Sequence, residues 1–489
     1  MKELKLVSVL RTFSNDEIKE FEKFIKSPFH NTGRNFMPIY SYLKKYHPEY
    51  PAEKITAERI YRKLYGSLTE DKEKVSLTVR VLFSQLAHLA EKFLIHSAIE
   101  KNEYESLKIS AGVYQQRHLY ELCDKNILKS RNELIKKGIQ SSYPDEMKVL
   151  NSLSFRNKMN QDQQYTGAEI YKHSPLYITA KLFLDIRPML NNKINFGTKD
   201  DTPSLIFKDL IFGFDVDKFK ELSEDDGSGT KENCILDYYI CRLKYEENFG
   251  MYKLVSDEYI SSQSRLSHFF KWSFFTAIFN LGYVKAHSVD YENYGKILLS
   301  LSSLTLDNDV YSFEPGGYLY AAAYEMIFNI HFGFVSGDEL SEFWQKHIRK
   351  VKKDQRKYIN RYSEAFIEFR KGHFESALRH ISGLKPEAII QKNILYRLKI
   401  CCLIDAGYYD SASDTIESYA RFLSGNSRVS RVIRKYGSNF LSGIRAVLRN
   451  EEKDSPKNIN ELTNAAVDNR NSHFGWWFKN KTNENKKGH

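Results

Sequence analysis

The amino-acid sequence predicts an all-α protein, in which stacked antiparallel helix pairs follow an N-terminal helical domain. Apolar residues recur at helical spacing along most of the 489 residues, and no convincing stretch shows the two-residue alternation of a strand. Only 11 prolines and 24 glycines occur, so few residues interrupt helices. One short pattern of Gly, aromatic, acidic, Ser and Ala residues also appears twice, which is typical of helix-pair arrays.

Residues 1–103 are expected to form the N-terminal helical domain. Ser14 and Glu17 fit a capping box at the start of one helix, and Thr56 is placed to cap another. A wide apolar stripe over 69–99 predicts a long helix at the centre of this domain. A short helix before this long one has the outline of a helix-turn-helix, but the long helix is too apolar over too much of its surface to read DNA.

Helical patterns continue over 104–220. Gly, Ser and acidic residues then gather in 221–233 (ELSEDDGSGTKEN), which is the most linker-like part of the chain. A helical-repeat region is expected over 234–450, and a frayed polar tail, rich in Asn and Lys, over 451–489. An aromatic cluster inside this tail, 474–478 (FGWWF), is expected to fold back and cover the open apolar face of the last repeat, or alternatively to dock into a partner. Whether the helical regions form one superhelix or two bodies stays open.

The internal repeat is the most informative pattern. Residues 372–377 read GHFESA and residues 407–412 read GYYDSA, so the second copy begins 35 residues after the first. A Gly permits the tight turn between two antiparallel helices, and an Ala is small where the helices approach closely. Such a pair cannot bury its apolar face alone, so it is expected to stack on its neighbours.

On these residues, the segment 358–425 resembles tetratricopeptide repeats. Those repeats also combine a Gly–aromatic turn with a small residue in the second helix, and often a closing proline, here Pro386. About two degenerate units are covered, because Tyr362, Ala365 and Phe366 stand where a Trp-Leu-Gly pattern is expected. A generic stack of helix hairpins is an equally good interpretation.

The resemblance implies a non-catalytic scaffold that binds a protein or peptide. The first helices of such repeats usually line the concave side, which implies a partner surface of four residues. They are Tyr362, Asn393, Tyr396 and Arg397.

The N-terminal segment carries a second resemblance. Residues 13–31 (FSNDEIKEFEKFIKSPFHN) and 39–50 (IYSYLKKYHPEY) are similar to the opening of uncharacterised helical proteins in bacteria of the Bacteroidetes type. This similarity implies no function.

A basic balance suggests a different partner. The net charge is +11, and residues 341–450 hold 22 Lys and Arg against 10 Asp and Glu. Clusters within 346–361 and 428–435 are each expected to lie on one helix face, where they can follow phosphates. The residues of these faces are Arg349, Lys353, Arg356 and Lys357, and then Arg428, Arg431 and Lys435. Nucleic-acid binding is therefore the alternative function, and a solvated outer surface is the competing interpretation.

Motifs for chemistry are scarce. The sequence has no GxxxxGK[ST] phosphate loop, no HExxH pair and no GxSxG elbow. His88, Glu91 and His96 could place ligands on one helix face, but the better interpretation is a set of boundary residues. The acidic run 224–227 lacks the spacing of a calcium loop and reads as a solvated linker. We therefore expect no enzyme, cofactor or metal, although residues far apart in sequence can still converge into an active site.

The expected location is the cytoplasm. The apolar run within residues 1–11 is too short for a signal-peptide core, and Glu3 falls where only positive charge is expected. The strongest apolar run, 268–284, is too short to span a bilayer, which needs about 20 apolar residues. Five cysteines occur without a CxxC pair, as fits a reducing compartment. No membrane partner is expected.

Overall fold

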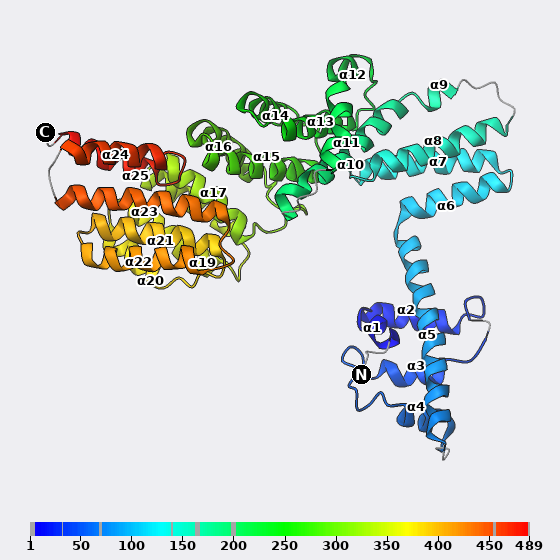
Figure 1. The fold of residues 1–489 in the computed structure, drawn as a ribbon. Coiled ribbons are helices and arrows are strands. Elements are labelled where there is room, and N and C mark those ends of the chain that lie inside the picture. Colours follow the sequence, from blue (N-terminus) through cyan, green and yellow to red (C-terminus); the bar gives the residue numbers. More distant parts are fainter. Residues whose placement is uncertain are drawn as a thin grey trace. The chain divides into compact units, whose positions relative to one another are not determined.

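The protein is all-α, as predicted (Figure 1). The described part of the chain holds 25 α-helices, one 3-10 helix and a single isolated β-bridge between Leu319 and Val351. None of its helices is long and apolar enough to cross a membrane. The computed structural model describes residues 5–31, 33–67, 71–137, 140–161, 167–196, 202–452 and 456–487.

The chain divides into two compact units and passes between them three times, once within the helix α8 (Tyr143–Met159). The first unit is residues 1–137 with 149–167, and the second is residues 138–148 with 168–489. The domain limits expected at 103, 220, 233 and 450 stay predictions.

The first eight helices begin the chain. They are α1 (Lys5–Arg11), α2 (Asn15–Lys26), α3 (Met37–Lys44), α4 (Ala57–Tyr65), α5 (Lys72–Lys101), α6 (Glu103–Gln116), α7 (Tyr120–Lys136) and α8 (Tyr143–Met159).

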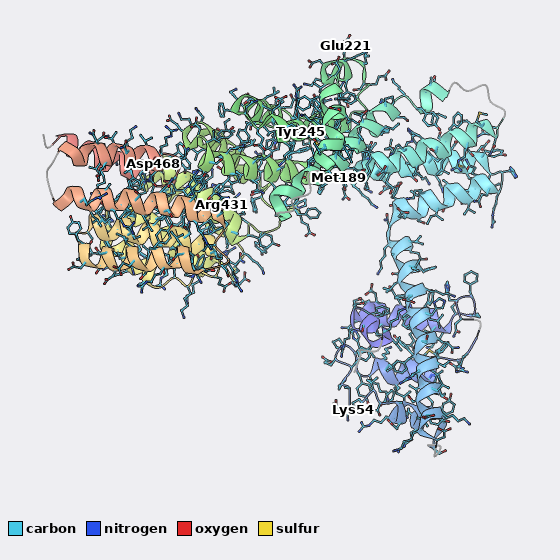
Figure 2. All side chains as sticks on the ribbon, in the orientation of Figure 1. Lys54, Met189, Glu221, Tyr245, Arg431 and Asp468 are labelled. Atoms are coloured by element: carbon cyan, nitrogen blue, oxygen red, sulfur yellow. The ribbon has the colours of Figure 1, made fainter. Side chains whose placement is uncertain are left out.

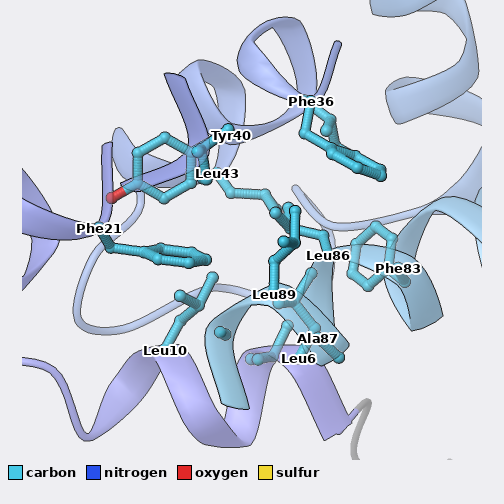
Figure 3. Close-up of a cluster of buried hydrophobic side chains, with 14 of the residues drawn as sticks. Leu6, Leu10, Phe21, Phe36, Tyr40, Leu43, Phe83, Leu86, Ala87 and Leu89 are labelled. Atoms are coloured by element: carbon cyan, nitrogen blue, oxygen red, sulfur yellow. The ribbon is translucent and has the colours of Figure 1, made fainter. Parts of the chain in front are cut away.

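The core of the N-terminal helices forms around α5, the long central helix that the apolar stripe predicts (Figure 3). Phe21 of α2 lies 5.3 Å, centroid to centroid, from both Tyr40 of α3 and Phe93 of α5. The Tyr40 hydroxyl donates to the Ile18 carbonyl at 2.5 Å, which satisfies its only polar atom inside this core. The predicted cap is also confirmed, because the Ser14 side chain accepts from the Glu17 N–H in a complete capping box.

The remaining helices follow in chain order. They are α9 (Gly167–Ile170), α10 (Ser174–Phe196), α11 (Thr202–Gly213), α12 (Val216–Leu222), α13 (Thr230–Glu246), α14 (Phe249–Ser261), α15 (His268–Ser288), α16 (Tyr291–Asp307), α17 (Ala321–Phe334), α18 (Gly337–His347), η1 (Ile348–Lys350), α19 (Arg356–Arg370), α20 (Phe374–Ser382), α21 (Ile389–Asp405), α22 (Tyr409–Gly425), α23 (Arg431–Glu452), α24 (Pro456–Asn469) and α25 (Gly475–Lys487).

Within the second unit, helices that follow each other in sequence pack as pairs, among them α15 with α16, α19 with α20 and α21 with α22 (Figure 1). Residues 223–229, in the segment expected to be a linker, connect α12 to α13. The Lys231 ammonium closes this loop by donating to the carbonyls of Lys220 and Ser223, at 2.7 and 2.8 Å.

The expectation of a frayed polar tail over 451–489 is wrong for its described residues. Most of them belong to α24 and α25, because a few apolar residues among the many Asn and Lys are buried: Leu462, Ala465, Phe474, Trp477 and Phe478. Composition alone hides this pattern.

The two copies of the repeat make the same helix-ending turn. Gly372 and Gly407 both have positive φ, 83° and 78°. The N–H of the residue after each glycine donates to the carbonyl five residues earlier. His373 donates to Glu368 at 2.9 Å, and Tyr408 donates to Leu403 at 2.8 Å. The N–H of each glycine also donates to the carbonyl three residues earlier. These two hydrogen bonds form a Schellman motif, whose left-handed residue is usually glycine. The 35-residue offset therefore corresponds to a repeated backbone structure.

The two glycine turns give a stability test. Gly372→Ala and Gly407→Ala should each lower the free energy of unfolding by about 1–2 kcal/mol, because an L-residue is strained in the left-handed region. A Cβ at either position meets no atom within 4 Å, so the loss comes from the backbone alone. Urea unfolding followed by circular dichroism measures it. Gly425→Ala is the matched control, since that glycine has no positive φ and no neighbour within 4 Å, and an equal loss there would contradict the explanation.

Candidate functional site

Two of the four residues predicted to form the partner surface lie in the interior. Tyr362 of α19 is fully buried, and its hydroxyl donates to the Asn329 side-chain oxygen at 2.8 Å. Arg397 of α21 is 7% exposed, and its Nε donates to the Tyr419 hydroxyl at 3.1 Å. Both side chains therefore join helices together and do not face solvent.

The other two residues adjoin the same tyrosine. The Tyr419 hydroxyl donates to Asn393 Oδ1 at 2.6 Å, and the Tyr396 ring stacks on the Tyr419 ring with centroids 5.3 Å apart. The structure thus gathers Asn393, Tyr396 and Arg397 of α21 around Tyr419 of α22, while Tyr362 contacts Asn329 instead. Asn393 and Tyr396 are half-buried, and partner binding at these residues stays a prediction.

The turn before α25 is bound to α15 and α16 by hydrogen bonds. Asn471 accepts from the Tyr291 N–H at 3.2 Å and donates to the Val289 carbonyl at 2.9 Å. The His473 ring lies between two tyrosine hydroxyls, that of Tyr283 at 3.0 Å and that of Tyr291 at 2.8 Å. No pattern in the sequence links these positions, which are more than 180 residues apart.

Aromatic side chains continue this contact along α25. Phe474 is fully buried and packs edge-on against Phe332 of α17 and Phe440 of α23. The Trp476 ring lies 3.9 Å from the Arg370 guanidinium of α19, a cation–π contact. Trp477 Nε1 donates to the Asp405 carboxylate of α21 at 2.7 Å. The expectation that residues 474–478 fold back is confirmed, although they contact four helices and not the last repeat alone.

A pair of histidines is enclosed by this contact. The rings of His287 and His473 lie 4.3 Å apart, centroid to centroid. Burial lowers the pKa of His287 to about 4, and burial together with the neighbouring His287 lowers the pKa of His473 well below its usual value. His287 Nδ1 faces the Asn471 carbonyl, so it carries the proton, and its buried Nε2 has no partner among the described residues. A second proton on this ring would be buried without an acceptor.

The first predicted basic face is not a single helix face. The 3-10 helix η1 ends at Lys350, the backbone is extended at Val351, and α19 begins only at Arg356. The Arg356 guanidinium donates to the carbonyls of Val351 and Arg349, at 2.7 and 2.6 Å, and so stabilises the turn itself. Of the four residues predicted for this face, Arg349, Lys353 and Lys357 are exposed and have no ion pair in the described chain.

The second basic face is partly as predicted. Arg431, which is labelled in Figure 2, and Lys435 are exposed and stand one turn apart on α23. Arg428 is exposed too, but it precedes the helix, in the turn that joins α22 to α23. Arg428 therefore does not share the helix face.

Aromatic residues that the sequence did not single out lie beside the first cluster. The Leu319 N–H donates to the Lys350 carbonyl at 2.9 Å, which forms the bridge between Leu319 and Val351. Both bridge residues are buried, and in such a bridge their sequence neighbours point to the opposite face. Tyr318 and Tyr320 are accordingly 54% and 65% exposed. We call Tyr318, Tyr320, Arg349, Lys352 and Lys353 the aromatic–basic surface.

The residues considered for a metal are engaged in other contacts or exposed. His88 is exposed, Glu91 pairs with Lys5 at 2.7 Å, and the His96 ring packs against His30 at 5.1 Å. Across the part of the chain that is described, no three His, Cys, Asp or Glu side chains gather as a metal site needs.

The acidic residues of the run 224–227 contact side chains of the same chain. Glu224 pairs with Lys172 at 2.5 Å, and Asp225 pairs with Arg265. Asp226 accepts from the Tyr177 hydroxyl at 2.9 Å.

Comparisons with family models, curated proteins and solved structures found no match for this chain.

The contact of α25 with the other helices predicts a large core effect. Phe474→Ala should lower the free energy of unfolding by about 3–5 kcal/mol, since it leaves a cavity between α17 and α23. Deleting residues 472–480 should likewise lower the melting temperature. Thermal melting of the intact chain measures both. Lys479→Ala, at an exposed position of α25, is the control; an unchanged melting temperature for Phe474→Ala would show that this contact does not stabilise the fold.

The buried histidines predict a dependence on pH. A histidine whose folded pKa is below its unfolded value stabilises the fold above about pH 6.5, and this stability is lost as the pH falls towards the folded pKa. For His287 the loss should reach about 2 kcal/mol at pH 5. His331 and His347 act in the same direction, whereas Asp237 and Glu325, with pKa values raised by burial to about 6 and about 7, act against them.

A variant of His287 separates its contribution to the pH dependence of stability from those of the other buried groups. His287→Gln should make urea unfolding midpoints vary less between pH 7 and pH 5 than in the parent chain, even if it is less stable at both. An unchanged pH dependence would contradict a neutral buried His287.

Proposed function

We propose that this chain is a non-catalytic, tetratricopeptide-like helical-repeat protein of the cytoplasm that binds another protein. The repeated Schellman turns of Gly372 and Gly407 support the repeat assignment. The observation that carries the binding role is the aromatic–basic surface, where two tyrosines stand exposed beside cations.

Tyr318 and Tyr320 suit a binding surface because their backbone is already held in place. The N–H and the carbonyl of Leu319 both form hydrogen bonds of the bridge. The Ala321 N–H also donates to Gln355 Oε1 at 3.0 Å, so the segment that carries the two tyrosines is fixed. A tyrosine on a fixed backbone loses little conformational entropy on binding, and Tyr and Arg are enriched among the residues that dominate binding energy. The nearby Arg349 and Lys353 have no ion pair within the described chain, so an acidic partner segment would match them.

Nucleic-acid binding is the second candidate, and the same surface favours it. Proteins bind single-stranded nucleic acids by stacking the bases on exposed aromatic rings and by pairing the phosphates with nearby cations. Such binding weakens steeply as salt is added.

One pair of variants tests the proposal. Tyr318→Ala/Tyr320→Ala should weaken binding to a purified partner by about tenfold or more, since it removes the two exposed rings. Tyr408→Ala/Tyr409→Ala is the matched control, because those tyrosines are 47% and 44% exposed elsewhere in the same unit. The partner is first isolated from native lysate with and without nuclease.

The outcomes separate the two candidates. A protein that persists after nuclease, binds the purified chain directly and is lost only with the Tyr318/Tyr320 variant supports the proposal. Loss of all bound material with nuclease, together with salt-sensitive binding of a labelled oligonucleotide in fluorescence polarisation, supports the nucleic-acid candidate instead. Equal binding by both variants would remove this surface from either role.

A further inference from the structure

A cleft of about 370 Å³ opens between α13 and α15 in the second unit, and its lining shares no residue with the aromatic–basic surface. Its size is within the range of small-molecule sites. Polar and charged side chains from three helices converge on it. They are Arg187 of α10, Lys244 of α13, Glu247 just after α13, and Trp272, Ser273, Thr276, Asn280 and Lys285 of α15.

Most charges around this cleft are already paired. Arg187 contacts the buried carboxylate of Asp237 at 2.7 Å and donates to the Ser273 hydroxyl at 2.8 Å. Lys285 pairs with Glu247 at 2.6 Å. These two ion pairs are electrically balanced, so they leave no net charge in the cleft.

Lys244 is the exception. Its side chain is half-buried and lines the cleft, and it makes no hydrogen bond or ion pair with a described residue. Burial lowers the pKa of this ammonium to about 8, and the carboxylate of Glu247 offsets this only in part. The cleft therefore carries one positive charge that the protein leaves without a partner, at a place where water solvates it poorly.

The remaining walls of the cleft are mainly apolar. The Trp272 ring is held edge-on by Phe313, with centroids 5.4 Å apart, and Ala277, Leu281 and Val284 continue the same face of α15. A bound molecule thus meets one unpaired cation from α13, together with a flat aromatic ring and aliphatic side chains from α15.

We propose that this cleft binds a small organic anion, with its carboxylate or phosphate group on Lys244 and its apolar body against Trp272. Pairing with an anion replaces the missing solvation of the ammonium, and burial of the apolar body adds to the affinity. This site is independent of the protein-binding role proposed above.

Binding is tested directly with pyridoxine 5′-phosphate, a flat ring that carries one phosphate group, by isothermal titration calorimetry on the full chain. The parent chain should bind it, and Lys244→Met, which keeps most of the buried stem but removes the charge, should weaken binding by about tenfold or more. Lys399→Met is the matched control, because Lys399 is an exposed lysine of α21 without an ion pair in the described chain. Absence of binding to the parent chain, or equal weakening by the two variants, would overturn the proposal.

A second measurement leaves the cleft residues unchanged. Formaldehyde forms an imine with a neutral amine and releases water, and cyanoborohydride then reduces the imine to a stable methylated amine. Mass spectrometry should find Lys244 labelled before Lys399, and excess inorganic phosphate should slow the labelling of Lys244 alone. Labelling of both lysines at the same rate, or labelling of Lys244 that phosphate does not affect, would contradict an anion site.

Discussion

The contact of residues 471–478 with α15–α23 is the interaction on which the second unit most depends. Helix pairs such as α19 with α20 are joined by neighbouring stretches of chain, and contacts of this kind form locally. His473 differs, because it binds a tyrosine 190 residues away. Phe474 and the tryptophans then reach α17, α19, α21 and α23 in turn. One short segment thus links six helices, α15, α16, α17, α19, α21 and α23, in addition to the contacts that these helices make with their neighbours.

Local features of the fold were predictable because local physics decides them. The Ser14 side chain caps its helix by accepting a hydrogen bond from the backbone N–H three residues later. Gly372 and Gly407 end their helices in the left-handed conformation that closes the turn. The apolar stripe of α5 likewise identifies the face that becomes the core of the N-terminal helices. Each of these features is determined by residues that lie close together in the sequence.

The candidate site was less predictable because it depends on distant contacts. The sequence indicates that Tyr362 and Arg397 lie on first helices, but not that Asn329 and Tyr419 bury them. It indicates a run of cations near Arg349, but the bridge from Leu319 to Val351 interrupts the helix and brings Tyr318 and Tyr320 beside them. No spacing rule joins residues 319 and 351, because a single bridge has no periodicity to detect.

The position of the 471–478 segment in the sequence also affects how the protein is made. A ribosome synthesises α15, α17, α19 and α21 well before it reaches His473, so the apolar faces around Phe332 stay uncovered during that interval. Uncovered aromatic surface on a growing chain attracts chaperones and other nascent chains. The last stage of folding for this unit therefore waits until residues 471–478 have been made, and its yield in a cell depends on how quickly that segment closes over the surface already formed.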